Sequence, residues 1–156
     1  MKKINQFILE KLKINKDTKS HKYNYHPKDK DELIDLLNKL IKERGNEANL
    51  NDIDTSKITN MSGLFLNSDF NGDISEWDVS NVTNMLLMFD DSKFDGDLSK
   101  WNVSKVTNMS SMFARSSFSG KNGDISSWDV SNVKNLNKTI FKKCPAEKNP
   151  PSWYYV

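Results

Sequence analysis

The segment DISEWDVSNVTNM at residues 73–85 returns as DLSKWNVSKVTNM at 97–109 and as DISSWDVSNVKNL at 124–136. The first two copies begin 24 residues apart, and the third begins 27 residues after the second because residues 120–122 lengthen the intervening loop. A weaker copy lies one period upstream, within residues 50–61. A fixed period of this length is the signature of a stacked-repeat architecture. The sequence therefore predicts about four repeats across residues 47–141.

Each repeat carries apolar residues at the same positions, which we expect to face inward. Its opening has the alternation of a short half-buried strand, whereas the NMxxMF run that follows has apolar spacings of three and four, which suit one or two helical turns. We therefore expect an α/β fold, a short leucine-rich-repeat-like solenoid of strand–helix–turn units with parallel strands and an N-terminal helical cap. The expected core positions are Trp77, Trp101, Trp128, Met88, Met112, Phe89 and Phe113.

An asparagine precedes the inward Met or Leu of each copy, at Asn84, Asn108 and Asn135. Buried polar groups must be hydrogen-bonded, so we expect these amides to hold the backbone of the turn in a ladder between repeats. The alternative is that they are solvated helix caps.

The repeats have flanking segments of different character. Residues 1–14 predict an amphipathic helix, 15–27 a polar linker, and 28–46 a helix that starts at a capping Asp and stops at Gly45. The apolar stripe of this second helix fits a cap on the first repeat, since terminal repeats need one to stay soluble, or a partner-binding helix. Residues 142–156, with three prolines and an aromatic end, form a second cap or an exposed tail.

The motif WDVSNVTNMxxMF, together with F-[ND]-G-D-[IL]-S, resembles the repeats of BspA-like leucine-rich-repeat surface proteins of bacteria, which also occur in mycoplasma-type lipoproteins. The resemblance covers residues 50 to 141. It implies a non-enzymatic adhesion or interaction protein that is secreted or membrane-anchored.

The N-terminus departs from that family pattern. A secretory signal needs an uninterrupted apolar stretch behind a basic start, and here apolar residues alternate with polar ones. No lipobox cysteine follows, and no apolar run is long enough to span a bilayer. We therefore expect a cytoplasmic protein. The opening MKKINQFILE also resembles the leader peptides of internal proteins of T-even-type phages, which implies the alternative of a packaged, virion-associated structural protein.

Catalytic and cofactor chemistry find little support. No nucleophile elbow, phosphate loop or zinc cluster is present. His21 and His26 lie in the polar linker with no third metal ligand nearby, so solvated side chains are the simpler interpretation. The repeated Asn-Gly-Asp and Asp-Gly-Asp segments suit positive-φ turns better than a weak Ca²⁺ site. We expect no enzyme activity, cofactor or metal.

The charge pattern argues against a nucleic-acid reader. The net charge is only +2, and the 23 basic residues include two arginines. Arginine supplies the bidentate base contacts of sequence-specific readers, so we expect no specific nucleic-acid partner. The pattern leaves the oligomeric state open.

The outward columns of the repeats differ in how much they vary. We call two of them the fixed columns, because they barely change between copies: Asp54, Asp78, Asn102, Asp129 and Ser56, Ser80, Ser104, Ser131. Such residues serve the coil through side-chain bonds to nearby backbone. A third, the variable column, differs in every copy: Asp52, Glu76, Lys100 and Ser127. Its side chains are free to recognise a protein partner, so we expect a non-enzymatic protein-interaction module.

Overall fold

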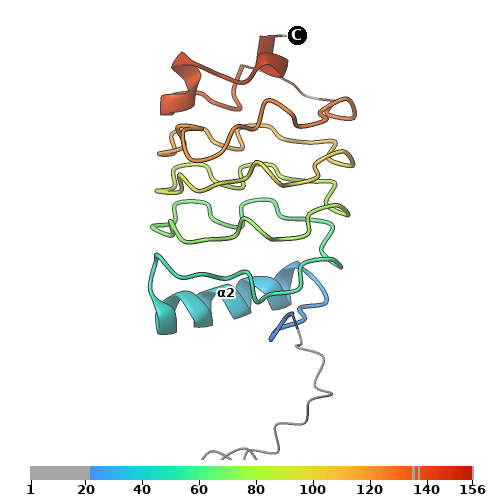
Figure 1. Ribbon diagram of the computed structural model, residues 1–156, viewed down its shortest axis with the longest axis vertical. Helices are drawn as coiled ribbons and strands as arrows, with labels where there is room; N and C mark the ends of the chain where they lie inside the picture. The colour runs from blue at the N-terminus through green and yellow to red at the C-terminus, as the bar shows by residue number, and fades with distance from the viewer. Residues whose placement is uncertain (1–21, 135, 137, 156) are drawn as a thin grey trace, which may run out of the picture.

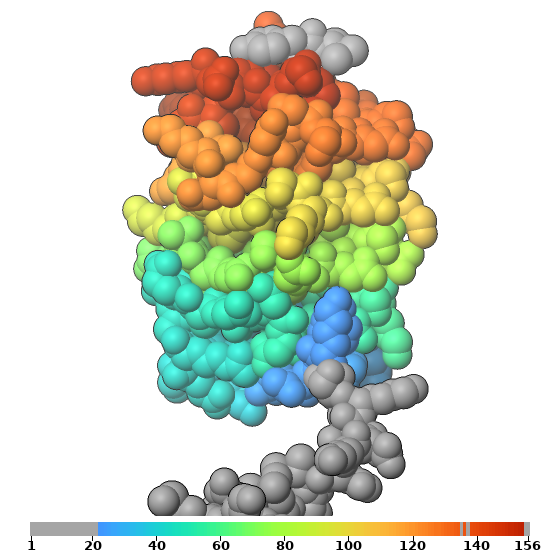
Figure 2. Space-filling model, in the orientation of Figure 1, coloured from blue at the N-terminus to red at the C-terminus, as the bar shows by residue number. Residues whose placement is uncertain are grey.

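The computed structural model describes residues 22–134, 136 and 138–155 as a column of stacked coils closed at both ends (Figure 1). The helix α2 (Lys30–Arg44) lies across the N-terminal end. The 3-10 helices η1 (Pro145–Lys148) and η2 (Ser152–Tyr155) lie at the C-terminal end. The coils between them appear as successive bands in the space-filling view (Figure 2).

The expected α/β class is wrong. Within the described residues α2 is the only α-helix, no sheet forms, and pairing is limited to four isolated parallel bridges: Tyr25 with Ile53, Asn49 with Asp73, Asn60 with Asn84, and Asn84 with Asn108. The apolar spacing of the NMxxMF run does not produce a helix because Leu87, within it, has a left-handed backbone with φ of 57°, and Asp91 follows at 54°. Two such residues in each of three successive coils (Gly63 and Asn67, Leu87 and Asp91, Ser111 and Arg115) turn the chain before a helix or strand can extend.

Backbone hydrogen bonds hold each coil to the next. N–H groups of one coil donate to carbonyl oxygens of the following coil: Met61 to Asn84 at 2.9 Å, Gly63 to Leu86 at 2.8 Å, and Phe65 to Met88 at 2.8 Å. The same pattern recurs one period later, from Met85 to Asn108 at 2.9 Å. The period of the sequence is therefore the length of one coil.

A ladder of stacked phenylalanine rings fills the core. Ring centroids of Phe65, Phe89, Phe113 and Phe141 lie 5.4, 5.5 and 5.6 Å apart in succession, and each pair of rings is within 2° of parallel. An aromatic pair contributes about 0.5–1.5 kcal/mol beyond the burial of its area. The ladder thus stabilises each coil against its neighbour.

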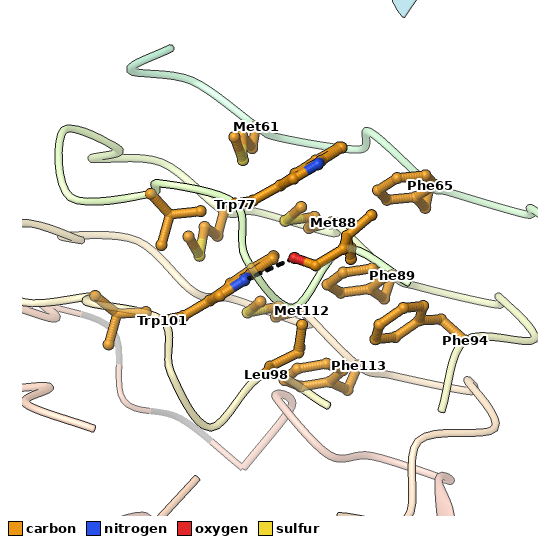
Figure 3. Close-up of a cluster of buried hydrophobic side chains, with 14 of the residues drawn as sticks. Met61, Phe65, Trp77, Met88, Phe89, Phe94, Leu98, Trp101, Met112 and Phe113 are labelled. Atoms are coloured by element: carbon orange, nitrogen blue, oxygen red, sulfur yellow. Dashed lines mark hydrogen bonds between the residues drawn. The ribbon is translucent and has the colours of Figure 1, made fainter. Parts of the chain in front are cut away.

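Each tryptophan of the repeats joins two coils. The indole Nε1 of Trp77, Trp101 and Trp128 donates to the backbone carbonyl oxygen of Leu50, Ile74 and Leu98 respectively, at 2.9, 3.2 and 3.1 Å. Figure 3 shows the bond of Trp101 among the surrounding methionines and phenylalanines. The three indoles are 3, 3 and 5% exposed, and Met88, Met112, Phe89 and Phe113 are fully buried. The structure thus places in the core the residues that the repeat comparison assigns there.

The N-terminal end is covered by α2 and the segment before it. The side chain of Asp29 accepts a hydrogen bond from the N–H of Glu32 at 2.9 Å and starts α2, whose Leu33, Leu37 and Leu40 are buried. The described part of the expected linker, residues 22–27, lies against the first coil, with Tyr25 bridged to Ile53 (Figure 2). The expected helix at 1–14 lies outside the described residues.

Candidate interaction face

The fixed columns bond to their own coil. The Oδ1 atom of Asp78 accepts from the backbone N–H of Ser80 at 3.0 Å and from its hydroxyl at 2.6 Å. Asp54 with Ser56 and Asn102 with Ser104 repeat this pair of bonds, and Asp129 accepts from the N–H of Ser131. The prediction that these columns serve the coil is confirmed. The side-chain oxygens of these Asp and Asn residues close Asx turns at one corner of each coil.

These turns also set the charge of the corner. Hydrogen bonds from the side chain and backbone of Ser131 lower the pKa of Asp129 below its ordinary value. Ser126 lowers the pKa of Asp124 in the same way at the preceding turn. Both carboxylates therefore stay ionised at neutral pH.

One member of the variable column, Asp52, has different surroundings from the other three. Asp52 accepts hydrogen bonds from Arg44, at 3.0 Å (Nη1 to Oδ1) and 3.1 Å (Nη2 to Oδ2), and from the Asn24 amide at 2.9 Å. The hydrogen bond from Arg44 is the main cause that lowers the pKa of Asp52. Asp52 thus belongs to the N-terminal closure of the column of coils.

The other three members of the variable column stay outside the scaffold. Glu76 and Lys100 form an ion pair across two coils, with side chains 46 and 64% exposed. The hydrogen bond from Glu76 is the main cause that raises the pKa of Lys100. Ser127 holds the same position in the next coil and is exposed. Among the described residues, none of these three side chains bonds to the backbone of a coil.

A cluster at the N-terminal end was missed by sequence reasoning. The guanidinium of Arg44 lies 5.6 Å from the ring centroid of Tyr25 and donates to its hydroxyl at 3.3 Å, beside the ion pair with Asp52. His26 Nδ1 lies 3.1 Å from Asp54. Because residues 22–27 and α2 lie outside the repeats, no comparison between repeats could reveal these contacts.

The glycine of each Asn-Gly-Asp or Asp-Gly-Asp segment has a different role from the expected one. Gly72, Gly96 and Gly123 do not have positive φ. A Cβ at Gly72 would lie 2.0 Å from the carbonyl oxygen of Ala48, and one at Gly96 would lie 2.6 Å from the Phe94 ring. The expected positive-φ turn is therefore wrong, and glycine is required because the coils and the phenylalanine rings approach too closely for a side chain.

In the part of the chain that the structure describes, no three His, Cys, Asp or Glu side chains are grouped to hold a metal ion. His26 contacts Asp54, and His21 lies outside the described residues.

The repeated asparagines bond within their own coil. The Oδ1 of Asn84 accepts from the N–H of Leu86 at 3.0 Å, and that of Asn108 from Ser110 at 3.0 Å. Both are only partly buried, and Asn135 lies outside the described residues. The ladder between coils that we expect of these amides is instead made by backbone groups, with Asn84 and Asn108 as bridge residues.

The surface is hollowed where the fourth coil meets the C-terminal segment. One hollow of about 680 Å³ has Ser119, Lys121 and Asn149 on its rim, and these residues also border a second hollow of about 380 Å³. Cys144, in the lining of the larger one, is buried, and burial raises the pKa of its thiol. The larger hollow lies on a different segment from the variable column.

No helix within the described ranges is both long and apolar enough to cross a membrane. A family described as "Mycoplasma protein of unknown function, DUF285" has a model that matches residues 35–153, from α2 to the C-terminal tryptophan. No curated protein and no solved structure matches the chain.

Proposed function

This chain belongs to the DUF285 family of mycoplasma proteins of unknown function, and we propose that it is a non-enzymatic protein-interaction module. One observation carries the proposal. The outward side chains that are constant between coils are hydrogen-bonded to the coil, whereas Glu76, Lys100 and Ser127 vary and bond to no coil backbone. Side chains without a scaffold role can give their hydrogen bonds and charges to a partner.

The partner would meet a row of side chains on successive coils. Glu76 and Lys100 present opposite charges side by side, and Ser127 adds a small hydroxyl donor. Such a row suits a protein surface with a complementary order of charges, because rim charges set partner choice and association rate. The resemblance of the repeats to BspA-like surface proteins supports an adhesion or interaction role for this face. The cytoplasmic or virion location expected from the N-terminal residues stays a prediction.

The experiment is a charge swap that preserves the ion pair. Glu76→Lys combined with Lys100→Glu keeps the net charge and the pairing but reverses their order on the face. We expect capture of the partner, by photo-crosslinking from position 127 and mass spectrometry, to fall while the melting temperature is kept, because exposed substitutions change stability by only about 0.5 kcal/mol.

A matched control swaps another exposed pair at the same spacing. Asp69→Lys with Lys93→Glu makes the same change between two adjacent coils, at exposed residues outside the variable column. This control should leave capture unchanged. Equal capture by wild type and the Glu76 and Lys100 swap would exclude the variable column as the binding face.

A further inference from the structure

The regular hydrogen-bond ladder continues through the point where the repeat is lengthened. The N–H of Asp95 donates to the Asn71 side chain at 2.8 Å, and the N–H of Ser119 donates to the Asp95 carboxylate at 2.7 Å. The Ser119 hydroxyl adds bonds to the same carboxylate. Ser119 therefore takes the place that a 24-residue period assigns, and residues 120–122 are additional to the coil.

Packing does not account for the added loop. A Cβ at Gly120 would meet nothing within 4 Å, and Lys121 is exposed. Two hydrogen bonds tie the loop to the coil: the Asn122 amide donates to the carbonyl oxygen of Asp95 at 2.5 Å, and the backbone N–H of Lys121 donates to the Ser119 hydroxyl at 3.2 Å. Insertions in repeat proteins form loops on one face, which is often the binding face.

The loop borders a hollow with uncompensated positive charge. Lys121, Lys143 and Lys148 line it, and none of their ammonium groups forms an ion pair with a described residue. Glu147 is the acidic residue of the lining, and its carboxylate accepts a hydrogen bond from the backbone N–H of Lys143 at 2.9 Å. The hollow therefore favours an anionic ligand.

We propose that this hollow binds an extended acidic peptide segment of a partner protein. Lysines are flexible point charges, which suit several carboxylates along a chain better than the fixed geometry of a single phosphate. The adjoining smaller hollow is lined by Ile125, Pro150 and Pro151, which offer apolar contacts beside the lysines, and also by the carboxylate of Asp124, which disfavours a peptide carboxylate in that half. A peptide that alternates carboxylate and apolar side chains fits both halves. No residue of the variable column lines either hollow.

The test uses a labelled peptide of sequence EELEEL and fluorescence polarisation, with QQLQQL as the uncharged match. We expect binding of EELEEL that weakens with added salt, and none of QQLQQL. Lys121→Gln with Lys148→Gln should weaken binding about ten-fold. Lys39→Gln with Lys42→Gln removes the same charge from exposed positions of α2, at the opposite end, and should leave binding unchanged. Equal losses in both variants would overturn the proposal, since attraction would then follow net charge alone.

Two further measurements separate the alternatives. Deletion of residues 120–122 restores the 24-residue step, so the variant should keep a cooperative melting curve and lose peptide binding. Retained binding in the folded deletion variant, or displacement of the peptide by inorganic phosphate as readily as by unlabelled EELEEL, would refute a peptide site here. The Glu76 and Lys100 swap should bind EELEEL as wild type does, so failure of one proposal leaves the other intact.

Discussion

The indole Nε1 of Trp153 donates a 2.8 Å hydrogen bond to the backbone carbonyl oxygen of Ile125, and so repeats the bond that Trp128 makes to Leu98 one coil earlier. The Trp153 ring also stacks on Trp128, with centroids 6.3 Å apart and planes within 9°. Yet Trp153 belongs to η2 and lies outside the repeats. The C-terminal segment therefore covers the last coil with the same side chain that a further repeat would present.

Removal of this indole should open the C-terminal end. Trp153→Ala should lower the free energy of unfolding by about 3–5 kcal/mol, as for other buried aromatic side chains. Trp153→Phe keeps much of the packing but leaves the Ile125 carbonyl without its donor, and should cost about 1 kcal/mol. Urea unfolding measures both. A Trp153→Ala variant as stable as wild type would show that the segment does not act as a cap.

Gly72 should be required because there is no room for a side chain, whereas Gly120 should be favoured only because its φ is positive. Gly72→Ala forces a Cβ to 2.0 Å from a backbone carbonyl oxygen, so we expect a loss of about 3 kcal/mol or failure to fold. Gly120→Ala meets no atom within 4 Å and should cost about 1 kcal/mol for its φ of 72°. Thermal melts of the two variants test this order, and the reverse order would contradict the close approach between coils.

Strain at a left-handed position should be relieved by glycine. Ser111 has φ of 53°, and the same position in the first coil is Gly63 with φ of 61°. Ser111→Gly should raise the free energy of unfolding by about 0.5 kcal/mol, because the relief of strain exceeds the entropy that glycine loses on folding. The neighbour Ser110 does not have positive φ. Ser110→Gly should therefore lower the free energy of unfolding by about 0.5–1 kcal/mol. A fall in melting temperature for both variants would exclude strain at 111.

The buried carboxylate of Asp90 should make the stability of the fold depend on pH in a known direction. The Asp90 side chain is 3% exposed, its Oδ2 accepts from Arg115 at 2.5 Å, and its Oδ1 has no partner. Burial raises the pKa of Asp90, against the opposing charge of Arg115. The folded state then holds this proton more tightly than the unfolded state. The contribution of Asp90 to stability is present below the ordinary pKa of 3.8 and is lost as pH rises through the raised value.

The test replaces Asp90 with alanine, the residue at the same position of the next coil. The melting temperature of Asp90→Ala relative to wild type should rise between about pH 3 and about pH 7. Asp69→Ala removes one exposed carboxylate nearby and serves as the control for net charge. A difference between Asp90→Ala and wild type that stays constant, or shrinks, as pH rises would contradict the raised pKa.

Comparison between repeats could predict which residues face inward, but not the shape of the backbone. Trp101 and Phe113 recur in register, and a residue that recurs on a stacked coil has the same neighbours each time. The left-handed backbone at Leu87 and Ser111 leaves no such signal, since neither residue type favours positive φ. The apolar spacing typical of a helix therefore occurs where the backbone turns, and the expected strand–helix–turn unit is absent from the described coils.

Repeat alignment could likewise predict part of the candidate site, but not all of it. Glu76 and Lys100 share a position in adjacent coils, so repeat alignment alone places them side by side. Asp52 holds the same position but is taken up by Arg44 and Asn24, which come from segments without any repeat partner. Contacts between a repeat and a unique segment depend on how the ends of the column are closed, and periodicity carries no information about that.

The backbone ladder joins each coil only to the coils directly before and after it. Each internal coil therefore offers its successor nearly the same surface that it receives from its predecessor. Unequal recombination within the gene could duplicate or delete a whole 24-residue unit while both closures stay in place. Relatives of different length would then be expected to differ by whole coils, and each added coil would bring one new residue to the variable column.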